Sequence, residues 1–420
     1  MDNPCAPVHF LRMTVDYDIV IIGGGLNGIT LARAMASVGL DVALVDALPV
    51  ETREAAGFDG RSYAMALSSV RLMQGLDLWE ALQDQAQPIL DIKVTDGRAG
   101  EGPSAFFLHF DHAEIEEGPM GYMVEDRFLR PYLLSKIAQT SGVTIFDCEE
   151  VVSQTCEAAG ISLSLASGKI LSARLVVGCD GRLSGTAQRA AIRRIGWNYG
   201  QTALVCALEH ALPHNGVAHQ FFMPPGPLAI LPLVGNRSSI VWSETHIGAR
   251  EINTLSDAEY TEVLRPRFGS FLGDFALTGQ RYTYPLSLSL ATRLVAERVA
   301  LVGDAAHGIH PIAGQGLNAG LRDIAALAEV LTDAYRRGED MGSAVVLARY
   351  EQWRRFDNTT LALATDTFNR LFSNDNPILR AVRTFGMTAV SRMPAVRRSF
   401  IREAAGLTGE LPRLLRGQSL

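Results

Sequence analysis

The chain has 420 residues, of which 47% are apolar and 20% are charged, and its formal net charge is −7. This length corresponds to two or three ordinary domains, or to one large domain with an insertion, and the composition excludes a disordered or fibrous protein. The negative net charge argues against a protein that binds nucleic acid. The five cysteines are scattered and never spaced as CxxC, so we expect neither a zinc site nor a disulfide framework, but a reducing compartment.

The two ends of the chain bear on its localisation. No run of 18 apolar residues is present, and the first sixteen residues lack the apolar stretch of a signal peptide, so we expect a cytoplasmic protein. From residue 379 onward, eight arginines face two glutamates, a local net charge of +6. Two interpretations of residues 379–416 stay open. The segment docks on the inner face of the cytoplasmic membrane or on a partner assembly, or it is a solvated helix packed on the core.

The clearest local pattern lies near the N-terminus. Residues 17–22 form a short apolar, β-branched run that is typical of a strand buried on both faces. Residues 29–38 have the pattern of a helix, with a glycine at position 39 where a C-cap is expected. Between the two lies Gly23-Gly-Gly25-Leu-Asn-Gly28, and a second apolar run, residues 42–45, ends at Asp46.

This strand–turn–helix–strand unit has the spacing of a dinucleotide-binding site. Gly23 permits the tight turn, Gly25 lets a pyrophosphate approach the backbone, and Gly28 lets the helix lie close to the strand. The phosphates would meet unpaired N–H groups at the positive end of the helix dipole. Asp46 can accept hydrogen bonds from an adenosine ribose, a residue that a plain glycine-rich turn would not require.

The middle of the chain is predicted to consist mostly of strands. Residues 89–110 are strand-like and turn-rich, residues 125–140 have a helical pattern, and residues 174–179 form another buried strand. That strand ends in Cys179-Asp180-Gly181-Arg182-Leu-Ser184, which by itself is more typical of a plain Asp-Gly turn than of a ligand contact. Residues 197–285 alternate short strands with proline and glycine breaks, and we expect an antiparallel sheet that the strands of 89–118 join.

A third motif follows the buried strand predicted at residues 299–302. It continues as Gly303-Asp304-Ala-Ala-His307-Gly-Ile-His310-Pro311-Ile-Ala-Gly314-Gln-Gly316-Leu317-Asn318. The strand delivers Asp304 to its carboxyl end, where open α/β sheets bind ligands. Pro311 stiffens the loop, while Gly314 and Gly316 let its backbone approach a flat ligand.

The end of this motif opens a helix near Gly316. The N–H groups of Leu317 and Asn318, with the helix dipole, would stabilise a ring that becomes anionic on reduction. A glycine loop that only caps a helix explains neither Asp304 nor the doubled glycines. Residues 344–416 are predicted to be mostly helical.

Together these patterns predict an α/β fold with discontinuous domains. A Rossmann-like dinucleotide-binding domain would comprise residues 15–88, 119–195 and 286–365, with a mixed β-sheet substrate domain of residues 89–118 and 196–285 inserted into it. Residues 366–420 would form a helical C-terminal segment. A second complete GxGxxG unit, which a reductase with two bound dinucleotides would need, is absent, and we expect no metal site.

The three motifs in this order resemble the fingerprints of the FAD-dependent aromatic hydroxylases, the class A flavoprotein monooxygenases. The likeness is closest to the ubiquinone-biosynthesis branch, which includes the polyprenyl-methoxyphenol hydroxylases, and it extends over almost the whole chain. The motifs that carry it are Gly57-Phe-Asp-Gly-Arg61-Ser-Tyr-Ala, Gly226-Pro-Leu-Ala-Ile-Leu-Pro232 and His310-Pro-Ile-Ala-Gly-Gln-Gly-Leu-Asn. The basic C-terminal segment matches least, and Tyr63 stands where the family has a small apolar residue, so it either alters the pocket or only packs.

The resemblance implies FAD as the bound cofactor and NAD(P)H as a transient co-substrate. It implies that the AMP half of FAD is held by Gly23, Gly25, Gly28 and Asp46, and that the flavin phosphates and ribityl chain meet Arg61, Arg127 and the Gly303-Asp304 pair. Asp180 and Gly181 would contact FAD and the nicotinamide. The isoalloxazine would be bordered by Pro311, Gly314, Gly316, Leu317 and Asn318.

The implied reaction is hydroxylation of the aromatic ring of a polyprenylated phenol, in which O₂ adds to the reduced flavin and the flavin hydroperoxide delivers one oxygen atom. The sequence identifies no catalytic base. His307 and His310 are candidates, although an imidazole bonded to loop carbonyls would serve structure alone. Phe222, Leu231 and Trp242 are candidates for the aromatic pocket, and each would also suit a core.

Three other functions remain open on the sequence. The chain could hydroxylate another small aromatic compound, or reduce a prenyl chain on the same fold. A non-catalytic binding protein on this scaffold would lack bound flavin.

Overall fold

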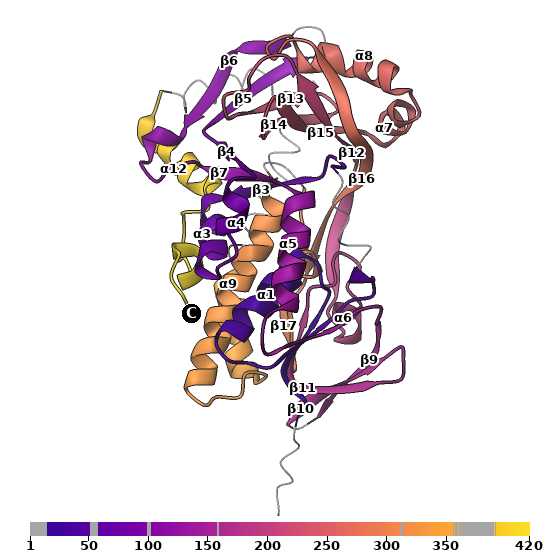
Figure 1. Ribbon diagram of the computed structural model, residues 1–420, viewed down its shortest axis with the longest axis vertical. Helices are drawn as coiled ribbons and strands as arrows, with labels where there is room; N and C mark the ends of the chain where they lie inside the picture. Colours follow the sequence, from indigo (N-terminus) through magenta and orange to yellow (C-terminus); the bar gives the residue numbers. More distant parts are fainter. Residues whose placement is uncertain are drawn as a thin grey trace, which may run out of the picture.

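Two eight-stranded sheets stand at opposite ends of the elongated molecule, and a three-stranded sheet lies between them (Figure 1). The protein is described from a computed structural model. It describes residues 15–50, 58–98, 102–157, 159–310, 314–355, 357, 360, 390 and 392–420. Pro311 and residues 379–389 of the basic tail lie outside the described residues, so the expectations for them remain predictions.

The first sheet is the parallel sheet that the sequence predicts. Its strand order is β17-β18-β11-β1-β2-β8, in which β1 (Tyr17–Ile22) pairs in parallel with β2 (Val42–Val45) and with β11 (Ile170–Gly178). The remaining strands of this path are β8 (Val143–Phe146), β18 (Val299–Leu301) and the antiparallel β17 (Val295–Ala296). The four buried strands predicted near residues 17, 42, 174 and 299 are therefore confirmed.

Both faces of this sheet are covered, as its continuous apolar strands require. Helices α1 (Leu26–Ser37), α5 (Asp126–Ala138) and α9 (Gln315–Arg336) pack on one face and share a continuous apolar core with it (Figure 1). Strands cover the other face, because β9 (Val151–Glu157) and β10 (Gly160–Leu165) fold back from β11 and join a second core there. The sequence analysis did not anticipate this hairpin.

The second sheet confirms the expected antiparallel sheet that strands of 89–118 join. Its order is β19-β16-β12-β15-β14-β13-β5-β6, and only the β13–β5 pair is parallel. The strands are β5 (Asp91–Arg98), β6 (Gly102–Asp111), β12 (Arg194–His210), β13 (Val217–Met223), β14 (Gly226–Leu233), β15 (Arg237–Thr245), β16 (Phe275–Ala291) and β19 (His307–Gly308). The long β12 and β16 form a ribbon that runs from this sheet down to the parallel one (Figure 1).

The expectation that residues 197–285 consist of short strands alone is wrong. Two helices, α7 (His246–Asn253) and α8 (Asp257–Phe268), interrupt them and cover one face of the second sheet. A capping box starts α8, because the Ser256 side chain accepts from the Glu259 N–H and the Glu259 carboxylate accepts from the Ser256 N–H. This Ser-x-x-Glu signal is visible in the sequence and could have predicted the helix.

The small sheet joins the two halves of the molecule. It has the order β3-β7-β4, formed by β3 (Ser62–Ala66), β7 (Gly121–Glu125) and β4 (Ala86–Ile89), and it leads into α3 (Leu67–Gly75) and the short α4 (Glu80–Gln83). After α9, residues 344–355 are helical. Helix α12 (Pro394–Ala404) then packs on β6, and a last 3₁₀ turn, η4 (Arg413–Arg416), lies against α3 and α9.

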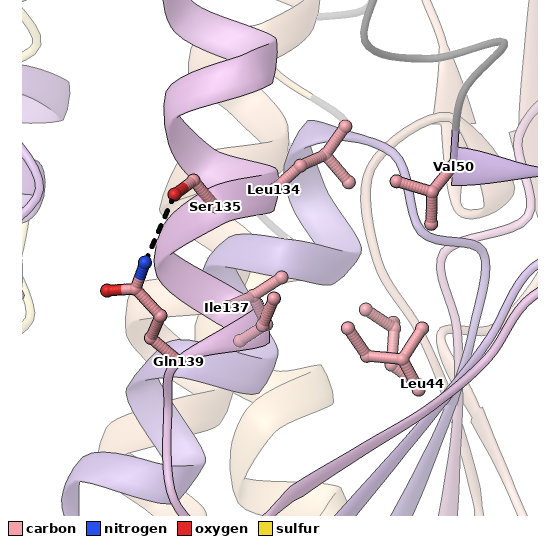
Figure 2. A pocket seen from close by; sticks show the side chains of 8 residues that line it. Leu44, Val50, Leu134, Ser135, Ile137 and Gln139 are labelled. Carbon is pink, nitrogen blue, oxygen red and sulfur yellow. Dashed lines mark hydrogen bonds between the residues drawn. The ribbon is translucent and has the colours of Figure 1, made fainter.

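Among the described residues, no helix is both long and apolar enough to cross a membrane. A cavity of about 280 Å³ lies between α5 and the adjacent strands β2 and β8 (Figure 2). Its described lining is Leu44, Val50, Leu134, Ser135, Ile137, Ala138, Gln139 and Ile145, of which none is charged or titratable. The described part of its lining therefore offers no group for acid–base or redox chemistry.

Candidate active site

The glycine turn between β1 and α1 has the close packing that its sequence predicts. Gly23 has a φ of +105°, in the left-handed region that favours glycine. A Cβ on Gly23 would overlap the carbonyl of Cys179, and one on Gly28 would overlap the carbonyl of Gly23. At Gly25, by contrast, no atom of the described residues lies within 4 Å of the Cβ position. Two of the three glycines are needed by the fold, and the third leaves room for a ligand.

Asp46 lies beside this turn, at the carboxyl end of β2. One carboxylate oxygen accepts a hydrogen bond from the Gly24 N–H at 2.5 Å, and the other accepts from the Leu48 N–H at 2.8 Å. The N-cap of α1 is Gly25, which offers no side chain to the first turn of the helix. The unpaired N–H groups and positive dipole of α1 therefore face the space beside Gly25.

The second motif has a structural role that the sequence analysis did not assign. Asp180 accepts hydrogen bonds from the Ser184 hydroxyl at 2.5 Å and from the Thr186 N–H at 2.9 Å, so its carboxylate anchors the start of α6 (Gly185–Arg189). Gly181 has a φ of +77°, and the described residues leave the space around its Cβ position open. The pair therefore forms a glycine turn at the edge of the sheet, with the Asp180 side chain already engaged.

The third motif builds a second glycine-capped helix at the same edge of the sheet. Helix α9 begins at Gln315, as predicted, and its N-cap is Gly314, with a φ of +64° and no side-chain cap. A Cβ on Gly314 would press on Ala64, whereas the described residues leave the space beside Gly316 open. The first turn of α9 thus has no side-chain cap and lies next to a space that the described residues leave open, as the first turn of α1 does.

Asn318 holds this helix start in place. Its side-chain oxygen accepts from the Ala66 N–H at 2.9 Å and from the Ser69 hydroxyl at 2.8 Å, while its amide nitrogen donates to the carbonyls of Ala64 and Gly314. These bonds use the whole side chain to tie α9 to β3 and α3. Only the backbone N–H of Asn318 is left for a ligand, and Leu317 likewise offers its backbone, since its side chain packs against the apolar core.

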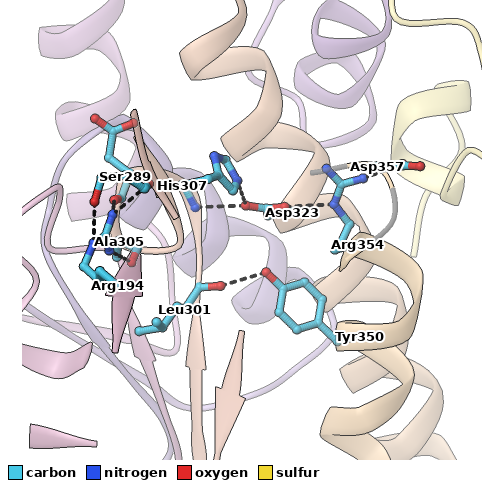
Figure 3. A network of polar contacts seen from close by, with 11 residues as sticks. Arg194, Ser289, Leu301, Ala305, His307, Asp323, Tyr350, Arg354 and Asp357 are labelled. Carbon is cyan, nitrogen blue, oxygen red and sulfur yellow. Dashed lines mark hydrogen bonds and ion pairs between the residues drawn. The ribbon is translucent and has the colours of Figure 1, made fainter. Parts of the chain in front are cut away.

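A buried ionic network lies beneath the same loop (Figure 3). The fully buried Asp323 of α9 accepts from the Nε2 atom of His307 at 2.5 Å, from the Gly303 N–H at 3.0 Å and from the Nε atom of Arg354 at 2.8 Å. Burial raises the pKa of Asp323, but His307 and Arg354 outweigh it and hold that pKa well below its usual range. His307 is therefore bonded to a carboxylate and not to loop carbonyls, and its Nε2 atom is not available as a catalytic base.

Asp304 keeps its carboxylate at the surface of the loop. It is paired with the Nε atom of Arg182 at 3.2 Å, and its side chain remains 42% exposed. The guanidinium of Arg194 donates to the carbonyls of Asp304 and Ala305, and to both the hydroxyl and the carbonyl of Ser289 on β16 (Figure 3). The loop is thus fixed through its backbone, and the Asp304 carboxylate stays available to a polar ligand.

His310 is buried, with 1% of its surface exposed. Its ring packs edge-on against Tyr199, with 5.2 Å between the centroids, and among the described residues neither ring nitrogen has a hydrogen-bond partner. Burial, assisted by nearby Arg182, lowers the pKa of His310 to about 4. A buried polar atom without a partner costs about 1–3 kcal/mol, so this ring favours a ligand that supplies a hydrogen bond.

The two arginines expected near the flavin phosphates lie at the junction of the small sheet with α5. Arg61 pairs with Asp59 at 2.7 Å and with the buried Asp126 at 3.2 Å, while Arg127 pairs with the buried Glu125 at 2.6 Å. Both guanidiniums remain partly exposed.

Tyr63 belongs to the same group of side chains. Its hydroxyl donates to Asp126 and accepts from Arg130, each at 3.0 Å, and burial with the Asp126 charge raises its pKa. Of the two alternatives for this residue, the structure therefore favours packing within an ionic network.

The three candidate pocket residues do not share one face of the second sheet. Trp242 is paired with Leu228, it is 1% exposed, and it packs edge-on to Tyr260 beneath α8. Because side chains alternate along a strand, Phe222 and Leu231 lie on the opposite face, where Leu231 packs toward the small sheet. Trp242 is therefore packed as a core residue, so of the two roles that the sequence left open for it the structure favours the core.

The residues present fit a flavin dinucleotide. Helices α1 and α9 both start without a side-chain cap, and each start adjoins a glycine whose Cβ position the described residues leave open. A partly exposed carboxylate and two partly exposed guanidiniums lie on neighbouring elements. Asn27 of α1 packs against Gly303 and Gly320, so the two helices are in direct contact. This arrangement can hold a pyrophosphate at one helix and a flat ring at the other.

Residues 16–359 match the family model described as an FAD binding domain. The chain belongs to this family. It is an FAD-dependent monooxygenase, and the resemblance to the ubiquinone-biosynthesis hydroxylases seen in the motifs is confirmed.

Two relatives span nearly the whole chain. The ubiquinone hydroxylase UbiL of Rhodospirillum rubrum is 45% identical over 406 residues, which cover 96% of this chain and 93% of that protein. The 3-demethoxyubiquinol 3-hydroxylase of Escherichia coli is 32% identical over 392 residues, which cover 93% of this chain and 98% of that protein.

Among solved structures, p-nitrophenol 4-monooxygenase PnpA from Pseudomonas putida DLL-E4 superimposes with a TM-score of 0.77. The superposition covers 94% of this chain and 98% of that one at 19% identity, and it confirms the expected fold.

Several residues of the site were not assigned a role from the sequence. Asp323 and Arg354 support the loop of residues 303–310, the proposed flavin loop, from below, and Arg182 and Arg194 hold it from the sides. Asp323 follows the third motif by five residues, and an acidic residue at that position was a visible signal. No local sequence pattern indicated the roles of Arg182, Arg194 and Arg354, because these side chains reach the loop through tertiary contacts.

Proposed function

We propose that this chain hydroxylates the aromatic ring of a polyprenylated phenol in ubiquinone biosynthesis, with FAD as cofactor and NAD(P)H and O₂ as co-substrates. The observation that carries the proposal is the pair of glycine-capped helices with open space at Gly25 and Gly316, on a chain 45% identical to a ubiquinone hydroxylase. When bound, FAD supplies the redox chemistry that activates O₂, and the chain supplies binding, orientation and exclusion of water.

The proposed roles of the cofactor-binding residues follow from where their free groups lie. The α1 turn and Asp46 would hold the AMP half, and the Arg61 and Arg127 guanidiniums would meet the phosphates, which they can bind bidentately. Asp304 would accept from the ribityl hydroxyls. The N–H groups at the start of α9 would face the isoalloxazine ring, where the positive end of the dipole stabilises negative charge.

We place the phenol on the face of the second sheet that carries Phe222 and Leu231. Tyr284 of β16 projects from this same face, is 46% exposed, and stacks with Tyr282 at 6.4 Å. These aromatic and aliphatic side chains suit an aromatic ring with an apolar tail. The ring nitrogens of His310 have no hydrogen-bond partner among the described residues, so His310 is the remaining candidate for a polar contact near the flavin loop.

We assign cofactor binding and substrate binding to the two domains expected from the sequence. Residues 15–88, 119–195 and 286–365 would bind the cofactor, and residues 89–118 and 196–285 would bind the phenol.

We further propose that α12 brings the enzyme to an anionic lipid surface, where a polyprenylated substrate resides. Met393 and Phe400 are 52% and 41% exposed, and the exposed Arg392 and Arg398 lie on the same segment. Apolar side chains flanked by arginines are suited to the boundary between lipid headgroups and acyl chains.

Deletion of the gene, followed by mass spectrometry of quinone precursors, tests the proposed function. Accumulation of a prenylated phenol that lacks one hydroxyl group would support it and would name the ring position. Normal ubiquinone levels in the deletion strain would remove the biosynthetic assignment. Recovery of the wild-type profile by the plasmid-borne gene is the necessary control.

A further inference from the structure

Two adjacent buried carboxylates lie at the junction of β7 and α5, and each is held by two guanidinium groups. Glu125 is 1% exposed and pairs with Arg127 and Arg237, while Asp126 is 3% exposed and pairs with Arg61 and Arg130. Arg61 and Arg127 are the two residues proposed to meet the flavin phosphates. The carboxylates therefore lie directly behind the proposed phosphate contacts.

Of the two carboxylates, Glu125 has partners in both halves of the molecule. One carboxylate oxygen accepts from the Nε atom of Arg127 at 2.6 Å, and the other accepts from a terminal amino group of Arg237 at 2.8 Å. Arg127 is the second residue of α5, which packs on the parallel sheet, and Arg237 is the first residue of β15 in the second sheet. A single buried carboxylate thus links a cofactor-side element to the substrate-side sheet.

An aromatic ring completes this bridge. The guanidinium carbons of Arg127 and Arg237 lie 4.9 Å and 4.7 Å from the ring centroid of Phe58. Arg237 is further fixed by its Nε atom, which donates to the Val234 carbonyl at 3.2 Å in the turn before β15. Both guanidiniums therefore have defined positions, because each is held by a carboxylate oxygen and by the Phe58 ring.

The bonding leaves the phosphate-binding part of Arg127 free. A guanidinium has five N–H donors, and Glu125 uses only the one on Nε. The terminal amino groups of Arg127 make no hydrogen bond to any described residue, so they remain available to a phosphate. The orientation of that free edge is set by Glu125.

We propose that Glu125 is a positioning residue that orients Arg127 for the FAD phosphates and couples cofactor binding to the placement of the second sheet through Arg237. The proposal rests on the proposed contact between Arg127 and FAD. Without the Glu125 charge, two guanidiniums would share the Phe58 ring with no counter-charge between them, and Arg127 would lose the bond that orients it. Arg237 would then influence FAD affinity only through Glu125.

Titration of FAD into the flavin-stripped, full-length protein, followed by quenching of flavin fluorescence, tests this coupling. We expect Glu125→Gln to raise the Kd for FAD about 10- to 100-fold, the usual effect of losing a charged hydrogen bond. Arg237→Met should raise the Kd several-fold, even though Arg237 belongs to the other sheet. In the Glu125→Gln background, Arg237→Met should have no additional effect.

The matched control for Arg237 is Arg265→Met. The guanidinium carbon of Arg265 lies 5.1 Å from the centroid of the Phe275 ring, and Arg265 pairs with Glu262 and Asp274. These residues all lie in α8, in β16 or between them, on the side of the second sheet. This variant should leave the Kd for FAD unchanged. Thermal unfolding of each stripped variant separates a loss of fold from a loss of affinity, and the milder Arg237→Lys and Glu125→Asp variants replace any that fail to fold.

Two results would overturn the proposal. The effects of Glu125→Gln and Arg237→Met could simply add, which would mean that Arg237 acts on FAD independently of Glu125. Alternatively, either single variant could bind FAD as tightly as the unaltered protein. Because the unaltered protein would still bind FAD in both cases, these failures are distinguishable from a failure of the proposed function.

Discussion

Asp304 is the carboxylate best placed to meet a polyhydroxylated chain. It lies at the end of the β18 strand and is partly exposed, while Arg194 fixes its backbone from β16. Its pairing with Arg182 at 3.2 Å leaves the second carboxylate oxygen available. The Asp304 side chain is thus held in position, and one of its carboxylate oxygens can still accept hydrogen bonds from a ligand.

We predict that Asp304→Ala weakens flavin retention about tenfold or more, because hydrogen bonds to a charged group are lost. The measurement is the flavin content of the purified protein after gel filtration, with the Kd for FAD from fluorescence titration. Asp111→Ala is the control, since Asp111 is also partly exposed but lies at the end of β6 in the second sheet, where it caps a 3₁₀ turn and pairs with His112. Equal retention in the two variants would mean that Asp304 does not bind the ribityl chain.

His310 gives a second prediction, on the pH dependence of stability. Its pKa of about 4 lies below the ordinary histidine value of 6.5, so between these two pH values the unfolded chain binds a proton that the folded protein does not. The contribution of the neutral His310 to the free energy of unfolding is therefore fully present above pH 6.5. It falls as the pH drops toward 4, by up to about 1.4 kcal/mol per pH unit.

Urea unfolding of the flavin-stripped protein between pH 4 and pH 7.5 measures this slope. His310→Asn cannot titrate in this range, so its stability should fall less steeply with decreasing pH than that of the unaltered protein. Identical slopes for the two proteins would show that the imidazole is solvated in solution.

Helix α9 carries the flavin loop and is anchored at two points along its length. Asn318 ties its first turn to the small sheet, and Asp323, one and a half turns later, bonds to His307, Gly303 and Arg354. The glycines in the first turn allow the backbone to approach a ligand, and the anchors keep that backbone in place. The start of α9 is therefore held in place by side-chain contacts within the protein, which would preorganise it for a ligand.

We predict that Asp323→Asn destabilises the protein by about 3–5 kcal/mol, because it leaves Arg354 buried without its full counter-charge. Glu339→Gln is the control, since it removes a partly exposed pair with Arg349 that should contribute at most about 1 kcal/mol. Chemical unfolding at pH 7 measures both. A similar small loss in the two variants would show that the buried network is not important for stability.

Helix α12 offers a prediction about the location of the enzyme. Replacing Met393 and Phe400 together by serine should weaken co-sedimentation with vesicles that contain phosphatidylglycerol, by about tenfold, because two exposed apolar side chains would no longer enter the lipid. Binding should also weaken with added salt. Val345→Ser, at a 69% exposed apolar residue on another helix, is the control. Unchanged co-sedimentation of the double variant would exclude α12 as the docking element.

Elements were predicted from the sequence where a local pattern determined them. The buried strands and glycine turns of the parallel sheet follow from runs of apolar residues and from glycine spacing, and the start of α9 follows from its glycines. The β9–β10 hairpin was missed because one of its strands is largely exposed and lacks a continuous apolar run. Helices α7 and α8 were missed because prolines and glycines nearby suggested strands, although the capping box of α8 was present.

The site was predicted only in part, for a physical reason. Gly25 and Gly316, which are proposed to meet the ligand through the backbone, are recognisable in the sequence because each belongs to a glycine-rich motif. Residues that act through long side chains from distant segments are not, and Arg182, Arg194 and Arg237 belong to this class. The role of Trp242 could not be decided from the sequence, because the face of a strand cannot be assigned before its helical cover is known.

The molecule as a whole divides the work between its two halves. The parallel sheet with α1 and α9 forms the proposed cofactor cradle, and the second sheet lies at the other end of the molecule (Figure 1). One face of the second sheet packs apolar side chains toward the small sheet. The β12–β16 ribbon and the Glu125 bridge both connect the halves. The proposed oxygen transfer to a phenol would need both halves at once, because one is proposed to hold the redox group and the other is proposed to hold the ring.

Incorporation of labelled oxygen tests that account most directly. The purified flavoprotein, supplied with NAD(P)H, ¹⁸O₂ and a short-chain prenylated phenol, should yield a product that carries one ¹⁸O atom for each NAD(P)H consumed in productive turnover. A product that lacks the label, or that has gained hydrogen in its prenyl chain instead, would contradict hydroxylation and would favour a reductase on the same fold.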